Sequence, residues 1–139
     1  MGAVESQEIT VFATLARIAS ENSADFSAAQ LRGFQQFRGV RLFLDVTAFA
    51  GTLPTLDVNL QHKDPESGKY FDLAGGASVA FAQNTGVNQQ DDLTIYPGLT
   101  VLANRTVSDV IGLTWRIRAV ITGSGGVTFT FSLGAVLLP

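Results

Sequence analysis

The sequence predicts an all-β fold, an antiparallel β-sandwich or jelly-roll-like barrel of about six to eight strands with an extended N-terminal arm. Apolar and polar residues alternate along most of the chain after residue 39, which is the period-2 pattern of strands with one face in a core. Clusters of glycine, proline and polar residues interrupt this alternation, as turns do. We therefore divide the chain into an arm, residues 1–38, and a β-sandwich domain, residues 39–139.

The N-terminal arm differs in composition from the rest of the chain. Residues 9–16, ITVFATLA, have the composition of a short strand, whereas residues 20–36 are rich in Ser, Ala, Asn and Gln and show no clear period. A helix in this second part would be capped by Ser23 or Asp25, but Gly33 would interrupt it. We therefore expect a mostly extended arm.

Residues 39–73 are expected to form a β-meander, three consecutive strands joined by two turns. Residues 40–48 and 56–61 alternate between apolar and polar side chains. Residues 51–54 and 64–69 supply the turns, because proline presets φ and glycine accepts positive φ. The side chains expected in the core from this segment include Leu42, Leu44, Val58 and Leu60.

Further strand patterns follow after residue 73. Residues 77–83 and 93–96 are expected to be short strands, the second stopped by Pro97, with a polar loop between them. Residues 99–110 are expected to be a crossing connection.

The last part of the chain predicts a β-hairpin. Residues 113–121 and 127–135 alternate, and the glycine-rich residues 122–126 between them are typical of a hairpin loop. The side chains expected at the centre of the core are Trp115, Ile117, Phe129 and Phe131. Burial of such side chains contributes roughly 1.5–3 kcal/mol each.

Composition limits the classes of partner. Hydrophobic residues make up 46% of the 139 residues and charged residues 15%, against roughly 25% in a typical soluble domain. A surface poor in charge favours burial against other subunits. The chain has no cysteine, which fits assembly in a reducing cytoplasm.

Charge and hydropathy argue against two kinds of partner. The net charge is −3 and the basic residues are scattered, so we expect no nucleic-acid partner. No apolar run reaches the roughly 18 residues needed to span a bilayer, and the N-terminal residues lack the basic and apolar segments of a signal peptide. We therefore expect no membrane partner.

No pattern of catalytic or metal-binding residues stands out. His62 is the only histidine and continues the inward phase of its strand, which favours a structural or rim position. Asp64 and Glu66, like Asp91 and Asp92, lack the spacing of a calcium loop and are better explained as turn residues. We expect no enzyme activity, no catalytic or metal-binding residue and no cofactor.

Arg116 and Arg118 lie on the outward face of their predicted strand. They fit either a contact with an acidic partner or an ordinary solvated strand face.

An ordered series of segments resembles a group of small structural proteins of tailed bacteriophages, encoded among head and tail genes, in which a β-sandwich follows an N-terminal arm. The resemblance covers about residues 39–135. Its segments are VRLFLDVTA (40–48), GTLPT (51–55), LQHKDP (60–65), SGKY (67–70), YPGL (96–99), WRIR (115–118) and TFTFS (128–132).

The resemblance implies a capsid decoration, or cement, protein. Such a protein would be made in the host cytoplasm and would bind the exterior of the head shell at junctions between major capsid protein subunits, as a homotrimer. An extended arm can add main-chain hydrogen bonds to a neighbour by strand addition, so we place the partner contacts in the arm. The expected contact residues are Phe26, Arg32, Phe34, Phe37 and Arg38.

Two alternatives remain open at this stage. A tail or head–tail joining component would come from the same gene neighbourhood. A carbohydrate-binding β-sandwich would present aromatic side chains to a sugar, and its candidates are Trp115, Tyr70 and Tyr96.

Overall fold

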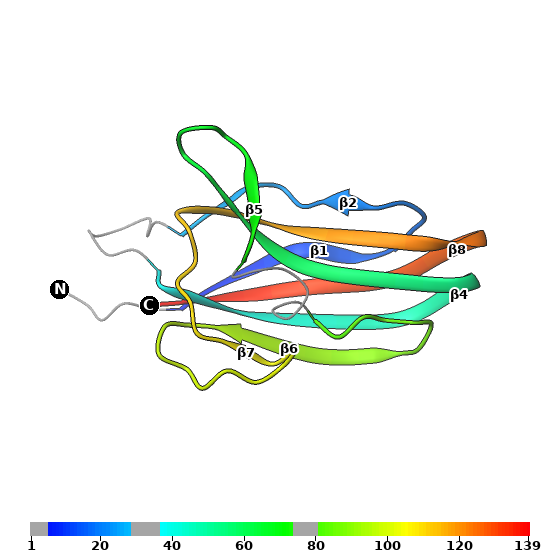
Figure 1. Ribbon diagram of the computed structural model, residues 1–139. Coiled ribbons are helices and arrows are strands. Elements are labelled where there is room, and N and C mark those ends of the chain that lie inside the picture. The colour runs from blue at the N-terminus through cyan, green and yellow to red at the C-terminus, as the bar shows by residue number, and fades with distance from the viewer. Residues whose placement is uncertain (1–5, 29–36, 74–80) are drawn as a thin grey trace.

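The computed structural model describes residues 6–28, 37–73 and 81–139. These residues contain no helix and form an eight-stranded sheet in which every strand pair is antiparallel except β6–β7 (Figure 1). The all-β class predicted from the sequence is therefore confirmed. The strands are β1 (Gln7–Arg17), β2 (Glu21–Asn22), β3 (Phe26–Ser27), β4 (Gly39–Lys63), β5 (Tyr70–Asp72), β6 (Gln89–Ile95), β7 (Thr106–Val107) and β8 (Thr114–Leu138).

The fold is built on a long two-stranded ribbon formed by β4 and β8. The two strands, each of 25 residues, pair along their whole length, from Gly39 opposite Leu138 to His62 opposite Trp115. Each strand runs to one end of the molecule, bends there and returns, as Figure 1 shows. The ribbon therefore folds over on itself and places its two halves face to face around one core.

Glycines make this bend possible. Gly51 in β4 and Gly123 in β8 have φ values of 107° and 132°, a region that side-chain-bearing residues rarely adopt. A Cβ atom on Gly123 would lie 2.6 Å from Cγ2 of Val127 and 3.1 Å from Cα of Pro54. The two strands therefore cross at the bend at a distance that only glycine allows.

The shorter strands extend the two layers. In the first layer, β1 pairs with the C-terminal half of β8, and β6 pairs with the N-terminal half of β4 and carries β7. In the second layer, β2 and β3 pair with the N-terminal half of β8, and β5 pairs with the end of β4.

The eight side chains expected at the core are all buried, none exposing more than 2% of its surface. They are Leu42, Leu44, Val58, Leu60, Trp115, Ile117, Phe129 and Phe131. They belong to one apolar cluster that includes residues from both halves of the ribbon. Period-2 alternation therefore identified the inward face of each half.

The predicted β-meander and C-terminal hairpin are wrong in their pairing. Residues 40–48 do not pair with residues 56–61, because both segments pair with β8. Residues 113–121 and 127–135 likewise pair with β4 and not with each other. Glycine and proline mark where the chain changes direction, but long-range contacts decide which strand becomes the neighbour.

The second predicted turn, residues 64–69, does connect paired strands. It joins β4 to β5, and the Asp64 amide donates a hydrogen bond to the Lys69 carbonyl at 2.8 Å. The Ser67 hydroxyl donates to the Asp64 carboxylate at 2.6 Å, which lowers the pKa of Asp64 together with the Glu66 amide. Asp64 is thus a turn residue.

The elements predicted after residue 73 agree with the structure only in part. The predicted strand at residues 93–96 begins earlier, as β6 (Gln89–Ile95), and the connection at residues 99–110 contains β7. Most of the strand expected at residues 77–83 lies outside the described residues.

The N-terminal arm is part of the sheet over its described residues. β1, β2 and β3 all pair with β8, and Phe12 of β1 is 6% exposed in the core. The structure therefore does not separate this segment from the β-sandwich. Phe12, together with the partly buried Ile9 and Val11, packs into the core of the same chain, which the sequence pattern did not reveal.

Candidate partner-binding surfaces

β1 forms one edge of the first layer. Among the described residues, no strand pairs with its outer side. An edge of this kind presents backbone N–H and C=O groups to which an extended segment of another chain can add. β1 contains no proline or lysine, which commonly protect such edges.

Only the first part of β1 is regular. Residues 7–10 pair in continuous register with residues 134–137 of β8, and register shifts follow between Thr10 and Phe12 and between Phe12 and Leu15. Shifts of this kind twist a strand and disturb its edge. The segment suited to strand addition is therefore Gln7 to Thr10.

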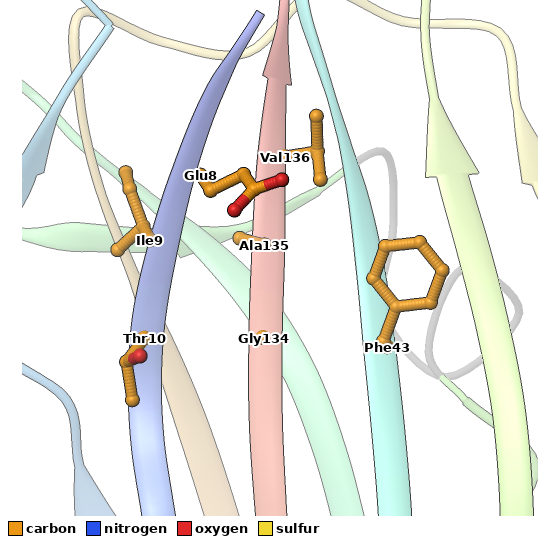
Figure 2. Close-up of a pocket in the computed structure, with 7 residues that line it drawn as sticks. All are labelled: Glu8, Ile9, Thr10, Phe43, Gly134, Ala135 and Val136. Atoms are coloured by element: carbon orange, nitrogen blue, oxygen red, sulfur yellow. The ribbon is translucent and has the colours of Figure 1, made fainter.

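A shallow groove lies on the outer face of the first layer beside this segment (Figure 2). Gly134 of β8 pairs with Thr10 on one side and Phe43 on the other, so no side chain fills the space between them. The groove has a volume of about 410 Å³. Its lining residues are Glu8, Ile9, Thr10, Phe43, Gly134, Ala135 and Val136.

The groove has a mixed lining, with the Phe43 ring on one side and the Glu8 carboxylate on the other. Figure 2 shows the Glu8 carboxylate extending over β8 and the Phe43 ring on the opposite side of Gly134. Phe43 is 43% exposed, and the Arg41 guanidinium lies 5.4 Å from its ring centre. Arg41 also pairs with Asp92 at 2.6 Å, so Glu8 is the charged residue without an ion-pair partner in the described lining of the groove. An apolar side chain next to a basic one would fit this surface.

A polar cluster on the second layer holds β5 against the chain before β3. The Tyr70 hydroxyl donates to both carboxylate oxygens of Asp25, at 2.7 and 2.8 Å, and the Lys63 ammonium lies 3.5 Å from the same carboxylate. The hydrogen bond from Tyr70, followed by the positive charges of Lys63 and Arg116, lowers the pKa of Asp25. These groups satisfy one another within the chain.

Both arginines of the predicted outward strand face have partners within the chain. The Arg116 guanidinium lies 3.3 Å from the centre of the Tyr70 ring and donates to Gln61 at 2.9 Å. Arg118 donates to Asn22 at 3.4 Å.

His62 lies at the rim of the second layer. Its Nδ1 accepts a hydrogen bond from the Gly112 amide at 2.7 Å. Burial lowers the pKa of His62, against the opposing negative charge of Asp109. The imidazole therefore acts as a neutral acceptor that attaches the chain before β8 to β4.

In the described part of the chain, no group of three or more histidine, aspartate or glutamate side chains lies close enough to hold a metal ion. No helix long and apolar enough to cross a membrane occurs there either.

The expected contact residues of the arm are not brought together. Phe37 is 3% exposed and belongs to the core, so its expected role as a contact residue is corrected. Phe26 is half-buried and packs on Trp115 with ring centres 5.0 Å apart. Arg38 is exposed beside the Tyr96 ring, while Arg32 and Phe34 lie outside the described residues.

The aromatic residues named for a carbohydrate platform are poorly placed for it. Trp115 is fully buried. Arg116 covers the Tyr70 ring, and the Tyr96 hydroxyl donates to the Pro139 carbonyl at 2.7 Å with Arg38 near its ring. Trp115 is therefore excluded as a platform, and neither tyrosine offers an unoccupied ring and hydroxyl.

The groove at Gly134 was missed by reasoning from the sequence. One feature of the sequence could have pointed to the groove: Phe43 is an aromatic residue at an outward position of its strand. The groove itself depends on how β1, β8 and β4 pair, and the sequence pattern did not predict that pairing.

Comparisons of this chain with protein-family models, curated proteins and solved structures found no match. A proposal of function therefore depends on the resemblance in sequence and on the surfaces described above.

Proposed function

We propose that the protein is a structural, non-catalytic protein of a tailed-bacteriophage virion. It is a capsid decoration protein that binds the outer surface of the head shell at junctions between major capsid protein subunits and stabilises the shell. It acts as a homotrimer, with no cofactor and no nucleic-acid or membrane partner. The resemblance over residues 39–135 supports this class, and the observation that carries the proposal is the exposed edge of β1 beside the groove at Gly134.

The proposed contact uses the flat segment of β1. An extended segment of the major capsid protein pairs with Gln7 to Thr10 through main-chain hydrogen bonds. One of its apolar side chains enters the groove against Phe43, and a neighbouring basic side chain meets Glu8. This protein loses little conformational entropy on binding, because its edge strand is already formed.

Binding at many equivalent sites gives such a protein its stabilising effect. Each copy that contacts two capsid subunits favours the assembled shell by mass action, since it binds that state and not the separated subunits. A modest affinity at each site is enough when the sites repeat over the shell.

The test is binding to expanded empty heads of the phage whose genome encodes the chain. Purified protein is expected to sediment with the heads and to raise their melting temperature. Electron microscopy of a labelled copy is expected to place it at regular positions on the shell exterior. Absence of binding to the heads would contradict the proposal, and a label on the tail or the neck would identify a tail or head–tail joining protein in its place.

A matched pair of variants tests the groove. Gly134→Phe fills the notch, and its side chain has room because the nearest atom to a Cβ there is the Ile9 carbonyl oxygen at 4.0 Å. Ser132→Phe places the same ring at another outward position of β8. We expect Gly134→Phe to weaken head binding at least about tenfold and Ser132→Phe to leave it unchanged. Equal binding of both variants would move the contact away from the groove.

A further inference from the structure

The first layer has a second open edge, on the side opposite β1. β6 forms this edge, and β7 pairs only with its last two residues, Thr94 and Ile95 (Figure 1). Among the described residues, no strand pairs with the outer side of the preceding part of β6, residues 89–93. Within the described part of the chain, the layer therefore has an open strand at each of its two sides.

The backbone of β6 is regular enough to accept another strand. Its seven residues pair with β4 in continuous register, and they include no proline or lysine. The Thr94 amide donates away from β4, to the Arg105 carbonyl at 2.8 Å. Because the direction of the N–H groups alternates along a strand, the amides of Gln90 and Asp92 also point to the open side.

A polar hollow lies on the outer face of the layer beside this edge. It has a volume of about 420 Å³ and is lined by Asp45, Val46, Thr47, Asn88, Gln89 and Gln90. Asp45 lies directly opposite Gln90 in the pairing of β4 with β6. The Asp45 carboxylate forms no ion pair or hydrogen bond with a described residue. The hollow therefore contains a carboxylate to which a cationic side chain from another molecule can bind.

The charges at the two edges select a basic partner. β6 carries Asp91 and Asp92 and no basic residue, and the regular part of β1 carries Glu8 and no basic residue. Asp92 pairs with Arg41, whereas Asp91 accepts a hydrogen bond from the neutral Gln89 side chain at 2.7 Å. Two copies of this chain joined edge to edge would bring carboxylates together, and like charges on paired strands are destabilising. A strand added to β6 therefore belongs to a different, basic chain.

We propose that β6 accepts an extended, basic segment of a second capsid subunit, which adds as a strand beside residues 89–93. Its backbone bonds to the outward groups of Gln90 and Asp92, and one lysine or arginine side chain enters the polar hollow toward Asp45. The added strand lies about 10 Å from β4, which is two strand spacings. A long basic side chain bridges most of this distance. The two open edges then join two neighbouring capsid subunits through one protein.

The identity of this partner rests on the proposed function, whereas the strand-addition site does not. A synthetic peptide therefore tests the site, and empty heads test the partner.

The first experiment measures the exchange of backbone amide hydrogens in the full chain by NMR. The probe is a seven-residue peptide in which valine and lysine alternate, and the control peptide has glutamate in place of each lysine. The lysine peptide is expected to slow exchange at Gln90 and Asp92, and the glutamate peptide to leave it unchanged. Absence of slowing at these two amides overturns the inference, as does equal slowing by both peptides.

A matched pair of variants tests the polar hollow with the same lysine peptide. Asp45→Asn keeps the shape of the side chain and removes its charge, and its affinity for the peptide is expected to fall about two- to fivefold. Glu66→Gln removes a charge from the exposed turn between β4 and β5 and should leave the affinity unchanged. Equal affinities of the two variants would overturn the role of Asp45.

The second experiment measures binding to empty heads. Gln90→Pro removes one outward amide, which an edge strand tolerates, and Gln90→Ala keeps that amide. Circular dichroism would verify that both variants fold. We expect the heads to bind Gln90→Pro about five- to tenfold more weakly than Gln90→Ala.

The outcomes separate this inference from the proposed function. Heads that bind the wild type and both Gln90 variants equally overturn the assignment of a capsid subunit to β6 and leave the proposed function in place. Heads that bind no form of the chain contradict the proposed function and this partner. Slowed exchange at Gln90 and Asp92 would then still support a strand-addition site for a basic segment.

Discussion

Buried polar side chains in this protein mostly bond to the backbone and so attach loops to the layers. Asn84, 1% exposed, donates to the Val87 carbonyl at 2.7 Å and accepts from the Gly86 amide at 2.8 Å. His62 accepts from the Gly112 amide, and Arg17 donates to three strand carbonyls. Among the described residues, Trp115 Nε1 has no hydrogen-bond partner. These groups hold the loops in place without forming a reactive cluster.

The protonation of His62 should make stability depend on pH. Burial lowers the pKa of His62 below its ordinary value of 6.5, because the folded chain favours the neutral imidazole. This contribution to stability is present above about pH 6.5 and is lost as the pH falls through the lowered pKa. We expect the free energy of unfolding of the wild type, relative to His62→Asn, to decrease as the pH falls below about 6.5.

Urea unfolding at a series of pH values measures this difference. Asparagine keeps an acceptor for the Gly112 amide and does not titrate. The His62→Asn variant is therefore the reference against which the pH dependence of the wild type is measured. A difference that stays constant from pH 7.5 to 5 would show that His62 titrates normally in the folded chain.

Leu53 should limit stability through its backbone. Replacement by glycine relieves the left-handed strain, roughly 1–2 kcal/mol, and loses part of that gain to the greater freedom of glycine in the unfolded chain. We expect Leu53→Gly to raise the free energy of unfolding by about 0.5–1 kcal/mol in urea titrations at a protein concentration low enough to keep the chain monomeric. Val101→Gly, at an exposed position with ordinary φ, should not raise it, and equal gains in both variants would remove strain as the cause.

At the scale of elements, β1 shows how a segment with the composition of an arm becomes part of a sheet. Phe12 packs against Phe131 with ring centres 5.6 Å apart, and Arg17 lies over both rings. The strand therefore contributes to the core along one side while its other side remains an open edge. The same strand stabilises the fold and offers a surface to a partner.

Truncation of Phe12 should reveal this structural role. Phe12→Ala removes a buried ring from the core and is expected to lower the free energy of unfolding by about 3–5 kcal/mol. Leu15→Ala, in the same strand but 60% exposed, should change it by less than about 0.5 kcal/mol. Chemical denaturation of both variants provides the comparison. Small and equal effects would mean that β1 behaves as a loose arm in solution.

The elements differed in how far the sequence could predict them. Alternation located the inward residues of β4 and β8, because burial on one face repeats every second residue whatever the neighbouring strand. It could not identify β2 and β3, since two-residue strands have no period and depend on pairing with β8. Phe37 was misplaced for the same reason, because its burial is decided by the ribbon and not by its own segment.

The candidate surfaces were harder to predict than the core. The edge of β1 depends on which strand lies beside it, and the notch at Gly134 depends on the registers of three strands. Such properties arise from long-range pairing, which local pattern does not encode.

On the scale of the whole molecule, almost every strand depends on pairing between residues far apart in the chain. Gly39 pairs with Leu138, and Gln7 pairs with Leu137. Loops of this length must close before the pairs form, and that closure costs conformational entropy. The ribbon cannot form from local contacts alone.

Folding should therefore be slow for a chain of this size. All-β domains with such long-range pairing fold in milliseconds to seconds, and we expect a refolding rate of roughly 1–1,000 per second in water at 25 °C. Stopped-flow dilution from urea, followed by Trp115 fluorescence, measures the rate. Refolding within microseconds would indicate that local elements dominate the transition state.

The paired ends of the ribbon have a mechanical consequence. Because Gly39 and Leu138 lie opposite each other, a force that pulls these two residues apart loads the hydrogen bonds of the ribbon one after another, as in opening a zipper. A force directed along β1 would instead load all of its hydrogen bonds to β8 together, in shear. The resistance of the protein to load thus depends on which strand receives the force, and a partner attached along β1 would pull in the stronger direction.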